Sequence, residues 1–290
     1  MDDITRHYGP YPAIDPSRPE LSQLGRAVLV TGSSSGIGFY IARAFAKAKA
    51  ATVILTGRQE KTLNEAVESL ASEYPETRFV GRVFDVANSQ EVERMWNDFD
   101  NEGLLINVLV LNAARIQFEK TPLLDRGHVE VVADYTTNVG SSLQFVDRFY
   151  RQKKRTPAQK LFLLNVSTFS IHNFEVNKDT PSYGLTKNGA ALALQLIARE
   201  VPASDMQVLS FHPGFIYTYS ARTLGYTDKS LFYHDDLPAH YAVWAASEEA
   251  AFLHGRFTWT EWDVVELSSG ELRKRIDDDS QYLRVGVIGL

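Results

Sequence analysis

Residues 28–38 constrain the fold of this chain more than any other stretch. An apolar run at 27–31 leads into a turn with three glycines, and apolar residues then recur at helical spacing over 37–50. Glycine lets the backbone approach a ligand closely, and the free N–H groups of a following helix attract an anion. The order strand, glycine turn, helix therefore predicts a docking place for a phosphate-bearing cofactor. The alternative is a flexible Gly/Ser linker, but linkers seldom lie between a strand-like and a helix-like run.

Length and composition favour one large domain that acts on a small molecule. The 290 residues, 44% of them hydrophobic, can bury a sizeable core. Lys and Arg total 30 against 36 Asp and Glu, and the net charge of −6 gives no electrostatic footprint for nucleic acid or an anionic membrane. There is no cysteine, which excludes disulfides and thiolate sites, and we predict no metal. No window approaches the roughly 20 apolar residues of a membrane span, so we expect a soluble, cytoplasmic protein.

Further apolar runs alternate with helix-like segments along the chain. The strand-like runs lie at 51–56, 78–83, 106–111, 160–166 and 206–211. This alternation predicts an α/β fold with a doubly wound parallel β-sheet flanked by helices, in a single domain over 26–269. We expect residues 1–25, which contain four prolines, to form an extended arm, and residues 270–290 a tail. The aromatic-rich stretch at about 217–245 is either a substrate lid or an ordinary packed helix.

The end of the second predicted strand bears on the choice of cofactor. In a dinucleotide-binding fold an acid at this place binds the ribose 2′-OH and repels a 2′-phosphate. Here the strand closes on Gly57, and Arg58 follows. A guanidinium beside a position without an acid suits a phosphate, so we favour NADP(H) over NAD(H). The alternative for Arg58 is an ordinary solvated cation.

Polar residues follow the predicted strands where a doubly wound sheet builds its site. Asp85 follows the third strand, Asn112 the fourth, and Thr168 and Ser170 lie in a hydroxyl cluster after the fifth. Asp85 and Asn112 could each instead be an ordinary turn residue. The loop after the fifth strand also contains His172, to which we assign no role.

Two helical segments carry candidates for chemistry. Asn138 lies inside a predicted helical region at 129–151, where Asn and Gly are poor residues, and this predicts a local kink. Tyr183 and Lys187 are four residues apart and share a helix face. An ammonium on that face would lower the pKa of the phenol and fit Tyr183 to exchange a proton near neutral pH. The Tyr–Lys spacing alone is a weak signal.

The motifs together resemble the classical short-chain dehydrogenase/reductases over about residues 25–265, and more loosely the fungal members found in specialised metabolism. They match the family pattern in type, order and spacing: TGxxxGIG at 31–38, an adenine-side acid at 85–86, NAG at 112–114, a helix-kink asparagine at 138, NxSS at 165–168, YxxxK at 183–187 and PGxIxT at 213–218. The resemblance implies a Rossmann-type sheet and a homodimer or homotetramer.

The resemblance also implies roles for individual residues. Tyr183 would be the general acid/base, Lys187 would bind the nicotinamide ribose and depress the phenol pKa, and Asn138 would anchor a proton-relay water. Asp85 would hold the adenine, Asn112 and Ala113 the adenosine-side ribose, and Ile216 and Thr218 the carboxamide. The full implied cofactor set is Gly32, Ser34, Ser35, Gly36, Ile37, Gly38, Arg58, Asp85, Val86, Asn112, Ala113, Tyr183, Lys187, Pro213, Gly214, Ile216 and Thr218.

Departures from the family pattern leave alternatives open. Thr168 stands where a serine polarises the substrate carbonyl, and Ser170 competes for that role. Ala114 replaces the usual glycine, and Trp-rich sequence replaces the usual glycine-rich ending.

Our leading hypothesis is an NADPH-dependent oxidoreductase that transfers hydride between NADP(H) and a hydrophobic carbonyl or alcohol. The alternatives are a non-redox enzyme (dehydration, isomerisation or cyclisation) that uses the same Tyr183 site, and a nucleotide-sensing regulator.

Overall fold

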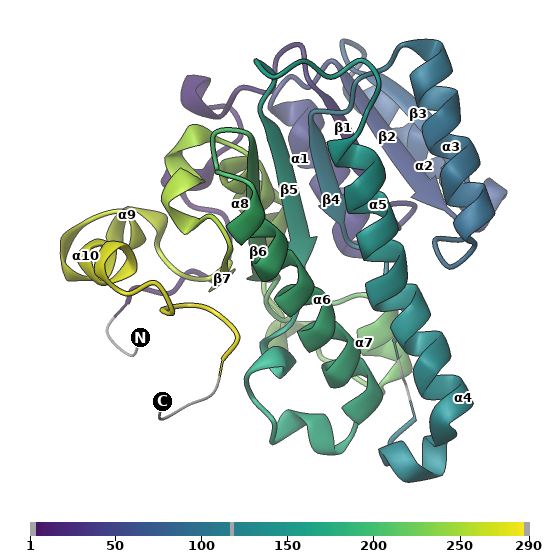
Figure 1. Cartoon of the computed structure of the whole chain (residues 1–290), viewed down its shortest axis with the longest axis vertical. Helices are drawn as coiled ribbons and strands as arrows, with labels where there is room; N and C mark the ends of the chain where they lie inside the picture. The colour runs from purple at the N-terminus through teal and green to yellow at the C-terminus, as the bar shows by residue number, and fades with distance from the viewer. Residues whose placement is uncertain (1–3, 117–118, 287–290) are drawn as a thin grey trace.

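A seven-stranded parallel sheet in the order β3-β2-β1-β4-β5-β6-β7 organises the computed structural model, which describes residues 4–116 and 119–286 (Figure 1). Its inner strands β2, β1, β4, β5 and β6 are almost entirely buried, as expected for a parallel sheet covered by helices, whereas the edge strand β3 is partly exposed. The predicted α/β fold is confirmed, although the fourth strand begins two residues later than predicted. The strands are β1 Ala27–Val30, β2 Thr52–Gly57, β3 Arg78–Val83, β4 Val108–Leu111, β5 Leu161–Val166, β6 Met206–His212 and β7 Arg256–Trp259.

Helices cover both faces of the sheet because successive strand residues point to opposite sides. In β1, Val28 and Val30 pack with α1 (Gly36–Lys47), α2 (Glu60–Glu73) and α8 (Asp236–Ala245). Leu29 packs on the other side, which is covered by α3 (Ser89–Glu102), α5 (Ser141–Tyr150) and α6 (Pro181–Glu200). The latter layer lies in front of the sheet in Figure 1. Among the described residues, no helix combines the length and apolar character needed to cross a bilayer.

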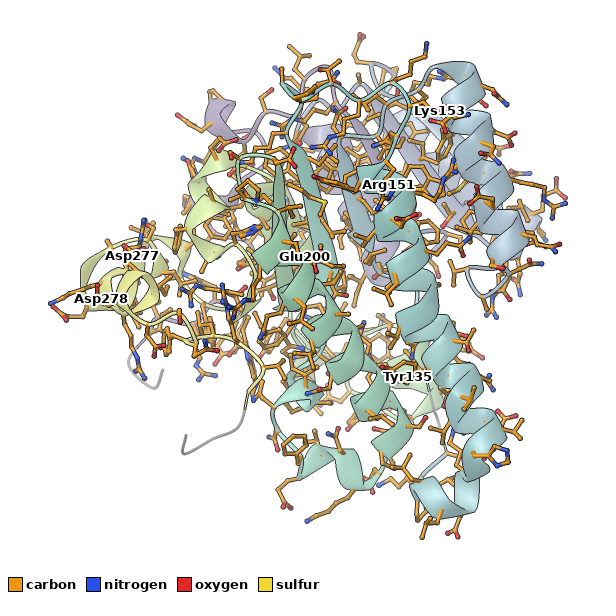
Figure 2. All side chains as sticks on the ribbon, in the orientation of Figure 1. Tyr135, Arg151, Lys153, Glu200, Asp277 and Asp278 are labelled. Carbon is orange, nitrogen blue, oxygen red and sulfur yellow. The ribbon has the colours of Figure 1, made fainter. Side chains whose placement is uncertain are left out.

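The long helix beside α6 is interrupted where the sequence predicted a kink. It consists of α4 (Leu123–Tyr135), a π-helical turn (Thr136–Gly140) and α5, and Asn138 lies in the π turn. The helix begins earlier than the predicted 129 and contains a non-helical Gly127. Tyr135, labelled in Figure 2, packs against α6 at Gly189, where a Cβ would lie 3.1 Å from the tyrosine hydroxyl.

The aromatic-rich stretch at 217–245 divides into two parts. Its first part holds only short elements, α7 (Tyr219–Thr223) and a 3-10 turn (Lys229–Leu231). Its second part is α8, whose side chains Leu237, Tyr241 and Trp244 are at most 1% exposed. The packing alternative therefore describes residues 236–245. For residues 217–232 the lid stays a prediction, and this segment is called the lid below. The remaining short elements are 3-10 turns at Pro12–Ile14, Pro19–Leu21, Phe169–Ile171, Val176–Lys178 and Glu248–Leu253, and the helices α9 Val264–Leu267 and α10 Gly270–Asp278.

The described parts of the arm and of the tail are both docked on the domain. The arm buries Ile14 and Leu21 completely in the core layer that contains α8. The tail is held by Arg256, a buried residue of β7, whose guanidinium donates hydrogen bonds to the carbonyls of Ile276, Asp279 and Tyr282. One buried side chain thus supplies hydrogen bonds to three backbone carbonyls that would otherwise lack a protein partner.

Replacing Arg256 by methionine removes these donors while keeping the apolar stem. We expect Arg256→Met to lower the free energy of unfolding by about 2–4 kcal/mol, because one buried and two partly buried carbonyls lose their partner. The control is Arg151→Met on the surface of the molecule (Figure 2), where the ion pair with Asp147 at 2.7 Å is exposed and worth less than about 1 kcal/mol. Urea unfolding of the three proteins measures the difference, and equal losses for the two variants would contradict the docking role.

Candidate active site

The glycine turn between β1 and α1 has the backbone geometry that close approach to an anion requires. Gly32 and Gly36 have φ values of 63° and 59°, in the left-handed region that favours glycine. At Gly38 a Cβ would lie 2.6 Å from both the Asn112 amide nitrogen and the Gly32 carbonyl oxygen, so only glycine fits there. Ser35 precedes the helix without capping it through its side chain. The first N–H groups of α1 are therefore available to a phosphate.

Asn112 holds this turn in place. Its amide nitrogen donates to the carbonyls of Thr31 and Gly32, both at 2.9 Å. The backbone N–H groups of Asn112 and Ala113 donate to the Thr31 hydroxyl at 2.9 and 3.0 Å. The structure thus gives the Asn112 amide a positioning role at the turn, whereas the resemblance implied a contact with the adenosine ribose.

A cavity of about 590 Å³ lies beside the ends of β2 and β3. It brings together two predicted residues, the exposed Arg58 and Asp85, whose carboxylate accepts from the Ala87 N–H at 2.9 Å. Arg82 and Arg94 also line it. The sequence analysis missed these two arginines, because nothing in their local pattern shows that β3 and α3 turn them toward Arg58. Three arginines thus line one cavity together with three carboxylates, those of Asp85, Glu91 and Asp98.

Tyr183 and Lys187 lie in the first turns of α6, as predicted. The buried Lys187 ammonium donates to the Val166 carbonyl at the end of β5 at 2.5 Å. Burial raises the pKa of Tyr183 to about 12 and lowers the pKa of Lys187 to about 8, since both charged forms lose hydration. The expected lowering of the phenol pKa by Lys187 is therefore wrong for the protein alone. Desolvation of the phenol is the cause of its raised pKa. The Lys187 ammonium donates its hydrogen bond to the Val166 carbonyl.

Asn138 ties the π turn to its neighbours through every polar atom of its side chain. Its carbonyl oxygen accepts from the Arg115 N–H at 2.7 Å, and its amide nitrogen donates to the Arg115 carbonyl at 3.0 Å and to the Thr186 hydroxyl at 2.8 Å. Thr186 precedes Lys187 on α6. Asn138 therefore fixes the loop after β4 against the helix that carries the Tyr–Lys pair.

The two competing hydroxyls after β5 lie next to each other. Thr168 donates to Ser170 at 3.2 Å between the two hydroxyl oxygens, and both side chains are buried. The Ser170 N–H in turn donates to the Thr168 hydroxyl at 3.3 Å. The two hydroxyls, which competed for one role in the sequence, therefore form a single polar unit at the sheet edge.

The loop after β6 lies against the glycine turn. Gly214 has a φ of 85°, and the Thr218 N–H donates to the Ile216 carbonyl at 2.9 Å. A Cβ on Gly36 would lie 3.7 Å from the Thr218 methyl carbon, which puts this loop beside the start of α1. Two predicted cofactor segments, at 32–38 and 213–218, are thereby brought together.

Behind this loop, His212 is buried in an aromatic cluster that the sequence analysis did not single out. Its ring lies 4.7 Å from that of Trp259 and 5.0 Å from that of Phe169, between ring centroids. Neither ring nitrogen has a hydrogen-bond partner in the described part of the chain. Burial, reinforced by nearby His172, lowers the pKa of His212 to about 3. The imidazole is therefore neutral at physiological pH.

Within residues 4–116 and 119–286, no group of three or more His, Cys, Asp or Glu side chains is arranged to hold a metal ion.

Comparisons with known proteins agree with this geometry. The short chain dehydrogenase family model matches residues 26–228. A short chain dehydrogenase/reductase of Claviceps purpurea is 33% identical over 267 residues, which cover 91% of this chain and 87% of that protein. The short chain dehydrogenase/reductase AacuD of Aspergillus aculeatus is 30% identical over 264 residues, 91% of this chain and 89% of that protein. The predicted resemblance to fungal members is confirmed.

A solved structure shares the fold at lower identity. The L-sorbose reductase of Gluconobacter frateurii, crystallised with NADPH and L-sorbose, superposes with a TM-score of 0.72 at 20% identity, covering 85% of this chain and 99% of that one. At this identity the likeness shows the fold alone.

The buried neutral state of His212 predicts a loss of stability in acid. The pKa is about 3 in the folded protein and about 6.5 in an unfolded chain, so between these pH values the unfolded state binds a proton that the folded state does not. Stability therefore falls as pH falls from 6.5 toward 3, by roughly 2 kcal/mol between pH 7 and pH 5 for this group. In His212→Phe the urea midpoint should drop less over that interval. An equal drop in variant and parent would contradict a buried neutral imidazole.

Proposed function

The chain belongs to the short chain dehydrogenase family, and from that premise we propose that it is an NADPH-dependent reductase of a hydrophobic carbonyl compound. Family membership supports an oxidoreductase that acts on CH–OH or C=O groups. One observation carries the proposal: Tyr183 and Lys187 lie together in the first turns of α6, and the Lys187 ammonium is bound to Val166 at the end of β5, two residues before Thr168. The Tyr183 phenol, whose pKa burial raises, holds its proton at neutral pH. A protonated phenol is the general acid that carbonyl reduction needs.

The residues at the carboxyl ends of the parallel strands fit a nicotinamide dinucleotide bound along this edge of the sheet. The N-terminus of α1 and the glycine turn would hold the pyrophosphate. Arg58 would meet the 2′-phosphate, helped by Arg94 in the same cavity. Lys187 would bind the nicotinamide ribose with the N–H groups that it does not donate to Val166.

The proposed mechanism divides the work among side chains of this chain. Bound NADPH supplies the hydride that is added to the carbonyl carbon. The Tyr183 hydroxyl donates a hydrogen bond to the carbonyl oxygen and then releases its proton to that oxygen. The Thr168–Ser170 pair supplies a second donor to the same oxygen. Lys187, still largely charged at pH 7 because its pKa is about 8, stabilises the phenolate that remains. A relay through a water near Asn138 would return the proton to Tyr183.

Aromatic side chains support an apolar substrate. Phe169 follows Thr168 directly, and its ring lies 5.5 Å from that of the exposed Phe215. A hydrophobic ketone would suit these aromatic surroundings. The likeness to fungal relatives supports a substrate from specialised metabolism. We further propose self-association as a homodimer or homotetramer through α6, which exposes Leu185, Leu192 and Leu196 beside the apolar residues of α4.

The role of Arg58 predicts a change in nucleotide preference. We expect Arg58→Ala to weaken NADPH binding about 10- to 100-fold, the worth of one or two charge-assisted hydrogen bonds, and to leave NADH binding within about twofold. The control is Arg78→Ala, an exposed arginine at the opposite end of β3. Fluorescence titration of the parent and the two variants with both nucleotides measures the six dissociation constants. Equal losses for NADPH and NADH would contradict a 2′-phosphate contact, and failure of both nucleotides to bind the parent protein would overturn the reductase proposal.

The role of Tyr183 predicts a loss confined to chemistry. Tyr183→Phe keeps the ring and removes the acidic hydroxyl, so kcat for ketone reduction should fall about 10²- to 10⁴-fold. NADPH affinity should stay within about threefold of the parent. Oxidation of NADPH, followed by absorbance with a panel of hydrophobic ketones, measures turnover. Conversion of a substrate without oxidation of NADPH, lost in Tyr183→Phe, would favour the non-redox alternative.

A further inference from the structure

A buried carboxylate, Glu261, lies between the N-terminal arm and the lid. Its side chain is 1% exposed and lies just beyond β7. One carboxylate oxygen accepts from the Arg6 guanidinium at 2.6 Å, and the other accepts from the Tyr233 hydroxyl at 2.6 Å. Burying a carboxylate is unfavourable unless its oxygens are paired. Glu261 therefore constrains the positions of two segments that are far from it in sequence.

Tyr233 closes the base of the lid. Its N–H donates to the Phe215 carbonyl at 2.7 Å, and it forms a parallel bridge with Ile216. Its ring covers Gly214 so closely that a Cβ there would lie 2.5 Å from a ring carbon. The two ends of the lid thus meet at Tyr233, which lies against the 213–218 loop. The family resemblance implies that this loop holds the carboxamide of the cofactor.

The arm reaches Tyr233 by further contacts. The Tyr8 ring packs edge-on against the Tyr233 ring with centroids 5.0 Å apart, and the His234 N–H donates to the Tyr8 carbonyl at 2.8 Å. The His7 N–H donates to the Glu261 carbonyl at 2.7 Å. Arg6, Tyr8 and Glu261 therefore surround the residue that joins the lid to the 213–218 loop.

We propose that residues 5–11 form a strap that positions the 213–218 loop through Glu261 and Tyr233. Arg6, Glu261 and Tyr233 are positioning residues, since none of them is part of the proposed catalytic set. The strap keeps the base of the lid closed and the loop in its binding conformation, so weakening it loosens the lid and weakens the hold on nicotinamide nucleotide. The effect on nucleotide rests on the proposed function, whereas the effect on the lid does not.

The test uses full-length variants and two independent readouts. Arg6→Ala and Tyr233→Phe each break one contact of Glu261, and the double variant tests their coupling. Arg18→Ala is the matched control, because Arg18 lies in the same arm and pairs with Glu249 at 2.7 Å, with no contact to Tyr233 among its hydrogen bonds. Limited trypsin digestion reports on the lid, whose Arg222 and Lys229 are exposed. Fluorescence titration with NADPH reports on the loop.

We expect Arg6→Ala and Tyr233→Phe each to speed cleavage after Arg222 and Lys229 roughly fivefold to tenfold and to weaken NADPH binding roughly threefold to tenfold. In the double variant, the changes in cleavage and in binding should not exceed the sum of the two single effects. Arg6→Lys should restore most of both, and urea midpoints check that global unfolding does not cause the cleavage. Cleavage and binding like those of Arg18→Ala would overturn the strap, as would faster cleavage with unchanged NADPH affinity. If the parent protein fails to bind NADPH, the proposed function falls, while the cleavage rates still decide whether the arm holds the lid.

Discussion

The hydrogen bonds of Asn112 to the glycine turn are the interaction on which the rest of the site depends. β1 and β4 are neighbours, with Val30 paired to Val110, and the strand order reverses between them. A crevice opens at such a switch point because the following connections leave to opposite sides of the sheet. At this switch point the Asn112 amide links the end of β4 to the turn after β1 by donating to the carbonyls of Thr31 and Gly32. It fixes the turn so that the start of α1 faces the crevice, and it leaves no room for a Cβ at Gly38.

A second consequence of the parallel sheet is that residues distant in sequence gather at one edge. Thr168 follows β5, Pro213 follows β6, and Lys187 on α6 reaches back to the last carbonyl of β5. Each strand supplies one or two polar residues and leaves the remainder of its length to the core. The site is therefore held by elements that are themselves buried on both faces, and its geometry depends on the sheet more than on the loops.

Much of this arrangement could be predicted from the sequence, because the relevant signals are local. Apolar runs mark the strands, the glycine spacing marks the turn, and Asn138 in a helical pattern marks the π turn. The pKa of Tyr183 could not be predicted, since it depends on how completely the fold removes water from the phenol. The pairing of Arg6 with Glu261 could not be predicted either. The two residues are 255 positions apart, and no periodicity connects an arm with the end of an edge strand.

The opposite effects of burial on Tyr183 and Lys187 bear on what the pair can do. Desolvation keeps the phenol neutral to a pKa of about 12 and makes the ammonium easier to deprotonate, with a pKa of about 8. Near pH 7 the pair therefore carries one positive charge and no negative one. Burying this single charge is unfavourable in free energy. When the phenol gives up its proton, the resulting phenolate and the ammonium attract each other in a medium of low dielectric constant. Under the proposed function, Lys187 would therefore stabilise the phenolate that proton donation leaves at Tyr183.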